Sequence, residues 1–351
     1  MRRITKWLSL TIGGVVGAGL VGFVASYFAF AGQFVVPATT LDDPSLPSRS
    51  IAGYRYHLEV FGLPTRPVVI VLHGGPGGDY RSLLPLKPLS DDYQVVFYDQ
   101  RGSGLSPRVP DEQLSSSQAI EDLHSVVTSL SPHAPVRLIG HSFGAMLAAA
   151  YLDRYPETVS HAVLAEPPFL TAEQGNQWYQ AIQGGQPPFS LALAEGAWRS
   201  LIESLYVYGP DPDARRDFFT SALAHLDLPG HPLAAYFCGS DLKNAYQPQW
   251  RLGSRALRGI LNKAREGGEF TEDIISPRAK HFPHKVLLLA GNCDTVIGPA
   301  VQRQNLALFA NAELAVIKDA GHTMIGEKPD ASLAVIKRYL AEDHSAIVAS
   351  E

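Results

Sequence analysis

From residue 51 onward, short runs of β-branched and apolar residues alternate with segments of helical periodicity. Several of these runs are apolar throughout, which is typical of strands in a parallel sheet that is covered on both faces. A regular succession of strand and helix predicts a doubly wound α/β sheet. The expected strands are 53–62, 67–74, 93–100, 135–140, 160–166, 285–291 and 313–320, and the expected helices are 115–130, 143–156, 298–310 and 329–340.

One long stretch, residues 167–284, interrupts this alternation. It is rich in aromatic residues, proline and glycine, and its helical pieces are irregular. We therefore expect a mainly helical cap inserted into an α/β core that consists of residues 51–166 and 285–351.

Composition and charge exclude some classes of protein. The chain has 351 residues, of which 46% are hydrophobic and 18% charged, enough to bury a large core. The net charge of −5 and the scattered basic residues give no case for nucleic-acid binding.

The cysteines and clustered histidines show no metal-site pattern. Cys238 and Cys293 match no metal or redox spacing, and the sequence leaves open whether they pair. His281 and His284 have no third ligand beside them, so no metal site is expected.

The N-terminal segment has the character of a membrane element. After the basic residues of "MRRITK", no charged residue occurs from Trp7 to Leu41, which is long enough for a membrane-spanning helix. The positive flank then predicts a cytoplasmic N-terminus, with the rest of the chain on the extracytoplasmic side of the membrane. The alternative is a cleaved signal peptide, because Ala29 and Ala31 form a small-x-small site, and the protein is then exported. We expect an anchor or signal over 1–34 and a proline-containing linker over 35–50.

The pentapeptide "GHSFG", residues 140–144, places Ser142 between two glycines. An apolar strand precedes it and a helix of small residues follows, which is the context that a nucleophile elbow requires. A serine on a strained turn leaves little room for Cβ atoms two residues away, and Gly140 and Gly144 supply that room. The sequence therefore predicts that Ser142 is a nucleophile.

A serine nucleophile needs a base, and the base needs a carboxylate to orient it. Asp294 directly follows the expected strand 285–291, and His322 directly follows the strand 313–320. Open α/β sheets gather their sites at these strand ends, and the order serine, acid, histidine is the one this architecture uses. Glu166, at the end of the strand 160–166, is an alternative acid.

Five glycine-containing motifs follow one another along the chain: "HGGPGG" at 73–78, "DQRGSGLS" at 99–106, "GHSFGA" at 140–145, "GNCDTVIGP" at 291–299 and "AGHTMIGEKP" at 320–329. Together they resemble the α/β-hydrolases, and the first two resemble the proline iminopeptidase branch in particular. The resemblance implies an α/β-hydrolase fold, a triad of Ser142, His322 and Asp294, and no cofactor. It also implies an oxyanion hole formed by backbone N–H groups of Phe143 and of Gly74 or Gly75. We further expect Asp99 and Arg101 to form a salt bridge that braces the loops under the site, and His141 to pack or line the pocket.

The resemblance leaves the substrate open. Proline iminopeptidases hold the free α-amine of their substrate with glutamates in the cap. Here Glu203 follows Trp198 by five residues, whereas the family's "WxxWE" motif places the glutamate four residues after its first tryptophan and has a second tryptophan that this chain lacks. We expect Glu203, Trp198 and Glu166 to contact substrate. The function predicted is a serine hydrolase acting on a small molecule or short peptide, an aminopeptidase or else an esterase or lactonase. A non-catalytic, membrane-tethered ligand-binding protein is the remaining alternative.

Overall fold

The computed structural model describes residues 17–184, 190–226, 231, 233–272 and 274–342. The chain divides into two compact units. The smaller unit comprises Met1–Val36 and Phe189–Leu226, and the larger comprises Pro37–Pro188 and Asp227–Glu351. Of the cap predicted over 167–284, residues 189–226 therefore belong to the smaller unit and the rest belong to the larger.

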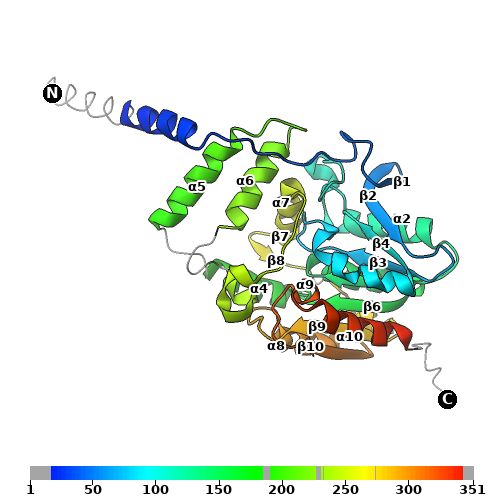
Figure 1. Cartoon of the computed structure of the whole chain (residues 1–351). Coiled ribbons are helices and arrows are strands. Elements are labelled where there is room, and N and C mark those ends of the chain that lie inside the picture. The colour runs from blue at the N-terminus through cyan, green and yellow to red at the C-terminus, as the bar shows by residue number, and fades with distance from the viewer. Residues whose placement is uncertain (1–16, 185–189, 227–230, 232, 273, 343–351) are drawn as a thin grey trace, which may run out of the picture. The chain divides into compact units, whose positions relative to one another are not determined.

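The larger unit contains an eight-stranded sheet (Figure 1). The first three strands in its spatial order pair antiparallel, and all the other neighbours pair parallel. The spatial order is β1 (Ser48–Ile51), β2 (Tyr54–Phe61), β4 (Gln94–Tyr98), β3 (Val68–Leu72), β5 (Val136–His141), β6 (Val159–Ala165), β9 (Val286–Gly291) and β10 (Ala312–Ile317), and a separate hairpin pairs β7 (Arg265–Glu266) with β8 (Glu269–Phe270).

Helices connect these strands and cover the sheet. The α-helices are α2 (Ser116–Leu130), α3 (Phe143–Arg154), α4 (Ala172–Gly184), α5 (Leu191–Ser204), α6 (Ala214–Ala224), α7 (Ser254–Lys263), α8 (Pro299–Asn305), α9 (Met324–Glu327) and α10 (Pro329–Ala341). The 3-10 helices are η1 (Tyr80–Asp91), η2 (Asp111–Gln113), η3 (Pro156–Thr158), η4 (Ala234–Tyr236), η5 (Cys238–Ser240), η6 (Leu242–Asn244), η7 (Pro277–His281) and η8 (Leu306–Leu308).

The central strands are buried on both faces, as their unbroken apolar runs predict. Side chains alternate along β3, so that Ile70 and Leu72 join a core with α2 and α3, while Val69 and Val71 join a second core with η1 and α10. All four side chains are fully buried. The prediction of an α/β sheet layered between helices is therefore confirmed.

Two helices begin with ordinary local signals. Ser115 caps α2, its hydroxyl accepting the backbone N–H of Gln118 at 3.1 Å. Pro329 begins α10 in the first turn, where a missing N–H costs nothing. The seven expected strands are all present. The linker predicted over 35–50 is wrong at its end, because Ser48–Ile51 pairs antiparallel with β2 and extends the sheet.

The N-terminal helix is only partly described. Residues 17–29 are helical, and the first 16 residues of the predicted anchor lie outside the described residues. Within the described part of the chain, no helix is long and apolar enough to cross a membrane.

Aromatic contacts hold the smaller unit together. The rings of Tyr27 and Tyr206 stack with centroids 4.6 Å apart, and those of Phe34 and Phe218 lie 5.3 Å apart. Ile202 of α5 is fully buried. The N-terminal helix and the residues after it thus contact α6 and the turn just after α5 in one local core.

Candidate active site

Ser142 lies at the end of β5, on the turn that leads into α3. Its backbone has φ 55° and ψ −122°, a conformation that non-glycine residues rarely adopt. The backbone N–H of Ser142 donates to the carbonyl of Ala165 on the neighbouring strand β6 at 2.9 Å. This geometry is the strained strand-to-helix turn that the motif predicts.

The glycines around Ser142 are required because main chain packs directly against them. A Cβ on Gly140 would collide with the backbone of Gly144, and a Cβ on Gly144 would collide with the carbonyl of Leu72 in β3. The predicted crowding is therefore present on both sides of the serine. Any larger residue at either position would displace the turn that presents Ser142.

The glycine loop after β3 lies against the serine. A Cβ on Gly74 would be 3.0 Å from the Cβ of Ser142. Gly75 has φ +124°, which strongly favours glycine. Phe143 is the first residue of α3, where a helix leaves its N–H groups without an intrahelical partner. The three residues predicted to form the oxyanion hole thus gather beside Ser142.

His322 follows β10 and is fixed by its main chain as well as by its ring. Its backbone N–H donates to the carbonyl of Tyr236 at 2.8 Å, and its carbonyl accepts from Nε2 of His141 at 2.8 Å. The His141 and His322 rings lie 4.6 Å apart. Because His141 immediately precedes Ser142, this contact joins the histidine loop to the nucleophile turn. His141 packs on His322, as the packing role predicted for it requires.

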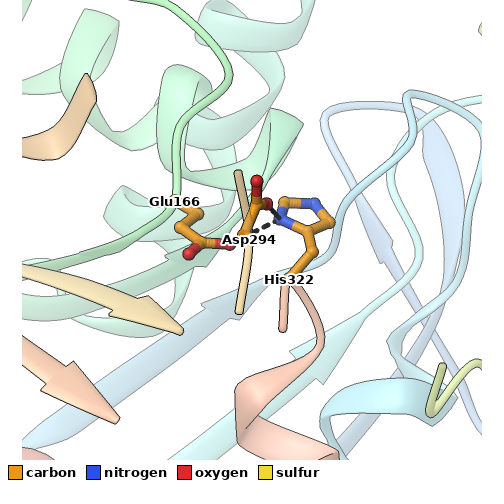
Figure 2. A group of neighbouring side chains, drawn as sticks. All are labelled: Glu166, Asp294 and His322. Carbon is orange, nitrogen blue, oxygen red and sulfur yellow. Dashed lines mark hydrogen bonds and ion pairs between the residues drawn. The ribbon is translucent and has the colours of Figure 1, made fainter. Parts of the chain in front are cut away.

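Two carboxyl groups face the imidazole of His322 (Figure 2). Oε2 of Glu166 accepts a hydrogen bond from Nδ1 at 2.8 Å, whereas Oδ2 of Asp294 lies 3.7 Å from the same nitrogen. The sequence ranked Asp294 first, but Glu166 makes the closer contact. Glu166 is fully buried, and its other oxygen accepts the N–H of Gly291. The prediction that Glu166 contacts substrate is therefore wrong, and its position fits the alternative prediction of an acid beside the histidine.

Burial dominates the ionisation of these groups. It raises the pKa of the Asp294 carboxyl to about 7, with a further increase from the nearby charge of Glu166. Burial also raises the pKa of Glu166 well above its ordinary value. The pKa of His322 is lowered by burial, and that of His141 falls to about 3, so His141 is neutral.

A disulfide joins two loops at the site. Cys293, which directly precedes Asp294, is bonded to Cys238. The chain just before Cys238 contacts both loops, because the carbonyl of Ala235 accepts the N–H of Thr295 and the carbonyl of Tyr236 accepts that of His322. The pairing that the sequence left open thus ties the cap segment to the loop that carries Asp294.

The predicted salt bridge between Asp99 and Arg101 is wrong. Asp99 instead contacts Nδ1 of His57 at 2.7 Å and accepts the backbone N–H groups of Tyr80 and Leu105. Arg101 forms a two-pronged ion pair with Asp122 of α2. Both residues do brace loops at the strand ends, but each does so through a partner distant in sequence.

The two cap residues expected to bind substrate belong to the smaller unit. Glu203 pairs with Arg199 on its own helix at 2.7 Å, and the indole N–H of Trp198 donates to the hydroxyl of Ser26 at 3.0 Å. Their contact with substrate stays a prediction.

One ligand atom from each of Glu166, Asp294 and His322 lies within 4.8 Å of the others, a grouping that could hold a divalent cation. Nδ1 of His322 would have to give up its proton to act as a ligand, because that proton is donated to Glu166. A bound cation would therefore break the hydrogen bond that orients the imidazole.

Comparisons with known proteins agree with this architecture. A family model described as "alpha/beta hydrolase fold" matches residues 67–329. The proline iminopeptidase of Saccharolobus solfataricus is 36% identical over 298 residues, covering 79% of this chain and 86% of that protein. The proline iminopeptidase of Lactobacillus acidophilus is 31% identical, covering 82% of this chain and 95% of that protein.

Two solved structures share the fold. A membrane phospholipase A superposes with a TM-score of 0.60 at 17% identity, covering 99% of this chain and all of that one. A proline iminopeptidase-related protein from Thermus thermophilus superposes with a TM-score of 0.58 at 24% identity, covering 85% of this chain and 97% of that one.

The chain belongs to the α/β-hydrolase family. It is a hydrolase, and within the family it resembles the proline iminopeptidases.

The lowered pKa of His322 predicts the acid limb of the pH profile. A general base works when neutral, and a pKa below the ordinary 6.5 keeps the imidazole neutral to lower pH. The acid limb of kcat/KM, which reports the free enzyme, should therefore have an apparent pKa below 6.5. An acid limb centred above 6.5 would contradict this assignment of the base.

Proposed function

We propose that the protein is a serine hydrolase that cleaves an acyl bond through a covalent acyl-enzyme. Ser142 is the nucleophile and His322 its general base, with the carboxyl groups of Glu166 and Asp294 behind the imidazole. The observation that carries this proposal is the strained turn at Ser142, whose neighbour His141 packs 4.6 Å from His322. A serine in such a turn beside an oriented histidine is the arrangement for nucleophilic catalysis.

Each residue has one task in the proposed reaction. His322 takes the Ser142 proton through Nε2 as the serine oxygen attacks the carbonyl carbon. The N–H groups of Phe143 and of Gly74 or Gly75 hold the resulting oxyanion, and one such donor contributes about 3 kcal/mol. The imidazolium then gives its proton to the leaving group, and His322 activates a water molecule that releases the acid and frees Ser142.

For the substrate, the relatives support an aminopeptidase that removes an N-terminal proline. Two proline iminopeptidases align over most of their length with this chain at 31% and 36% identity. In this version the carboxylate of Glu203 would recognise the free α-amine, after exchanging its ion pair with Arg199 for the substrate.

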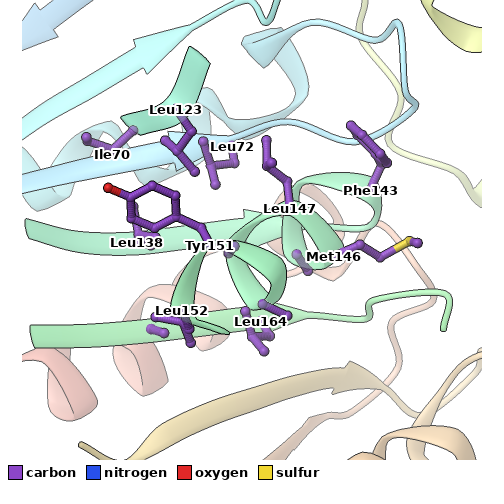
Figure 3. Packing of buried hydrophobic residues seen from close by; sticks show 14 of the residues in the cluster. Ile70, Leu72, Leu123, Leu138, Phe143, Met146, Leu147, Tyr151, Leu152 and Leu164 are labelled. Atoms are coloured by element: carbon purple, nitrogen blue, oxygen red, sulfur yellow. The ribbon is translucent and has the colours of Figure 1, made fainter. Parts of the chain in front are cut away.

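A cavity in the larger unit favours a second candidate, an ester with an apolar acyl group. The cavity has a volume of about 340 Å³ and runs beside α3 from the residue that follows Ser142. Phe143, Met146, Leu147 and Ala150 line it at intervals of three and four residues, which is one face of the helix. The first three are labelled in Figure 3 among the buried apolar residues. Ile260, Phe169 and Phe270 are among the apolar residues that also line it. An acyl chain held there would start next to the nucleophile.

We further propose that the N-terminal segment tethers the protein to a membrane, with the catalytic domain on the extracytoplasmic side. Five large apolar side chains of the helix over 17–29 are exposed, namely Leu20, Val21, Phe23, Val24 and Phe28. The disulfide supports an oxidising compartment, where such bonds persist. The likeness to a membrane phospholipase A that spans 99% of this chain is consistent with the proposal. A cleaved signal peptide, with export of the rest, is the alternative.

The nucleophile is tested with a fluorophosphonate probe. The probe should label the folded wild-type protein on the peptide that contains Ser142, because it reacts only with an activated serine. Ser142→Ala should remove the label and the turnover while leaving the melting temperature close to that of the wild type. Labelling of the Ala variant, or none of the folded wild type, would contradict the proposal.

A substrate panel separates the two candidates. Turnover of a proline arylamide should be compared with aryl esters from acetate to decanoate, in the wild type and in Ala150→Phe. If the cavity holds an acyl chain, the Phe variant should lower kcat/KM for octanoate about tenfold or more while acetate changes little. Arylamide cleavage without this selective loss on the longer esters would favour the aminopeptidase.

Membrane attachment is tested by fractionation of cells that express the full chain. We expect the protein to sediment with membranes after a high-salt wash, to dissolve in detergent, and to be digested by protease added outside the cytoplasmic membrane. Deletion of residues 1–22, which leaves Tyr27 and Phe34 in the core of the smaller unit, should release active protein into the soluble fraction. A full-length chain that is soluble and shielded from external protease would contradict the proposal, and a soluble, N-terminally shortened exported form would identify a cleaved signal.

A further inference from the structure

We infer that Glu166, rather than Asp294, is the ionised carboxylate that orients His322, and that Asp294 is held protonated so that it donates its proton to Glu166. The inference rests on the proposed function, because it assigns roles behind the same catalytic histidine. It makes Glu166 and Asp294 a pair with one negative charge and one shared proton.

The hydrogen bonds of Glu166 are those of a carboxylate. Oε1 accepts the backbone N–H of Gly291 at 2.7 Å, and Oε2 accepts the Nδ1–H of His322 at 2.8 Å. The Gly291 N–H is always a donor, and the His322 tautomer with a proton on Nδ1 is the one that leaves Nε2 free to take the Ser142 proton. A carboxylate at Glu166 accepts both N–H groups without a proton of its own. The residue is fully buried and has φ 45°, so the end of β6 holds its backbone in an uncommon conformation that directs the side chain inward.

The two carboxyl oxygens of Asp294 have different surroundings. Oδ1 accepts two backbone N–H groups, from Val296 at 2.7 Å and from Ile297 at 2.8 Å. Oδ2 is buried and has no hydrogen-bond partner among the described residues. A buried carboxylate oxygen without a donor is costly, but a protonated Oδ2 becomes a donor itself. Glu166 is the neighbouring acceptor: one oxygen of each carboxyl group lies within 4.8 Å of the other, and while burial raises the pKa of Glu166, a side-chain hydrogen bond with Asp294 opposes that increase.

Electrostatics favour one charge in this pair. Two carboxylates that share a buried site do not both ionise readily, because each charge opposes the other. The other titratable groups that face the pair are Tyr236 of η4, His322, and Glu327 of α9, and the ring of His141 lies 4.6 Å from that of His322. Glu327 is acidic and His141 is neutral, so these two supply no positive charge to stabilise a second carboxylate.

The pair changes what happens when His322 takes a proton. The serine proton arrives at Nε2, while the proton on Nδ1 stays in its hydrogen bond to Glu166. The negative charge of Glu166 then stabilises the imidazolium, and the Asp294 proton keeps that charge localised on the carboxylate nearest the ring. Asp294 and Glu166 both act through His322, so each is a positioning residue.

Two isosteric variants distinguish the acids. Glu166→Gln removes the charge that faces Nδ1 and should lower kcat about 1,000-fold or more with KM changed little, as expected for loss of the orienting acid. Asp294→Asn keeps a donor where the proposal places the proton, so it should lower kcat about tenfold. A loss of kcat in Asp294→Asn as large as that in Glu166→Gln, or larger, would overturn the inference. Asp294 would then be the acid that orients His322.

Rescue and pH dependence separate positioning from mere folding. Glu166→Asp restores the charge one methylene further away and should recover at least tenfold over Glu166→Gln. The wild-type kcat/KM profile should contain an ionisation of the pair near pH 7, where the raised pKa of Asp294 lies, and Asp294→Asn should remove it. Glu59→Gln, which alters a partly buried carboxylate bonded to the Tyr80 hydroxyl outside the site, is the control for folding. Equal losses of kcat in Glu166→Asp and Glu166→Gln would contradict the inference.

An infrared measurement tests the proton without turnover. The difference spectrum of wild type minus Asp294→Asn should show the carbonyl band of a protonated carboxyl group at neutral pH, and its absence would overturn the inference. This band does not depend on catalysis, so it separates failure of the acid pair from failure of the proposed hydrolase, which would appear as no fluorophosphonate label on Ser142. Activity that is lost with EDTA and restored by a divalent cation would show a metal in this cluster and would also overturn the inference.

Discussion

Main-chain crowding at the end of β5 is the constraint on which the rest of the site depends. A serine can hold a positive φ there only because Gly140 and Gly144 have no Cβ to meet the neighbouring backbone. Gly74 closes the same space from the loop after β3, against the Cβ of Ser142. The parallel sheet brings these segments together, since β3 and β5 are adjacent and their carboxyl ends share one edge. Packing of the sheet thus places the serine next to the backbone N–H groups that would hold an oxyanion.

The histidine and its acids are held by a second set of constraints. His322 is bonded through its backbone to Tyr236 and His141, and through its ring to Glu166. The disulfide fastens the Asp294 loop to the segment that ends at Cys238. These contacts come from strands β5, β6, β9 and β10 and from the cap segment, so the geometry of the base depends on the whole carboxyl edge of the sheet.

Much of the fold and part of the site could be predicted from sequence. Apolar runs predicted the seven strands because a two-sided parallel sheet leaves them no polar face. β1 was missed because an exposed antiparallel edge strand, "SRSI", carries no such run. The sequence identified Glu166 and Asp294 as acids at strand ends, but it ranked Asp294 first, whereas Glu166 makes the closer contact with Nδ1 of His322. The two carboxyl oxygens differ by about 1 Å in their distance from Nδ1 of His322, and packing in the folded protein determines this difference. The pairing of Cys238 with Cys293 likewise required their approach across 55 residues.

The central claim is that Ser142 carries the acyl group between the two steps of the reaction. Rapid acid quench of the wild-type protein with an aryl ester, followed by peptide mass spectrometry, tests it directly. We predict an added acyl mass on the peptide that contains Ser142, formed before steady state and lost at a rate consistent with kcat. Turnover of the same ester with no acyl mass on that peptide at any quench time, under conditions where release of the phenol shows a burst, would contradict the account.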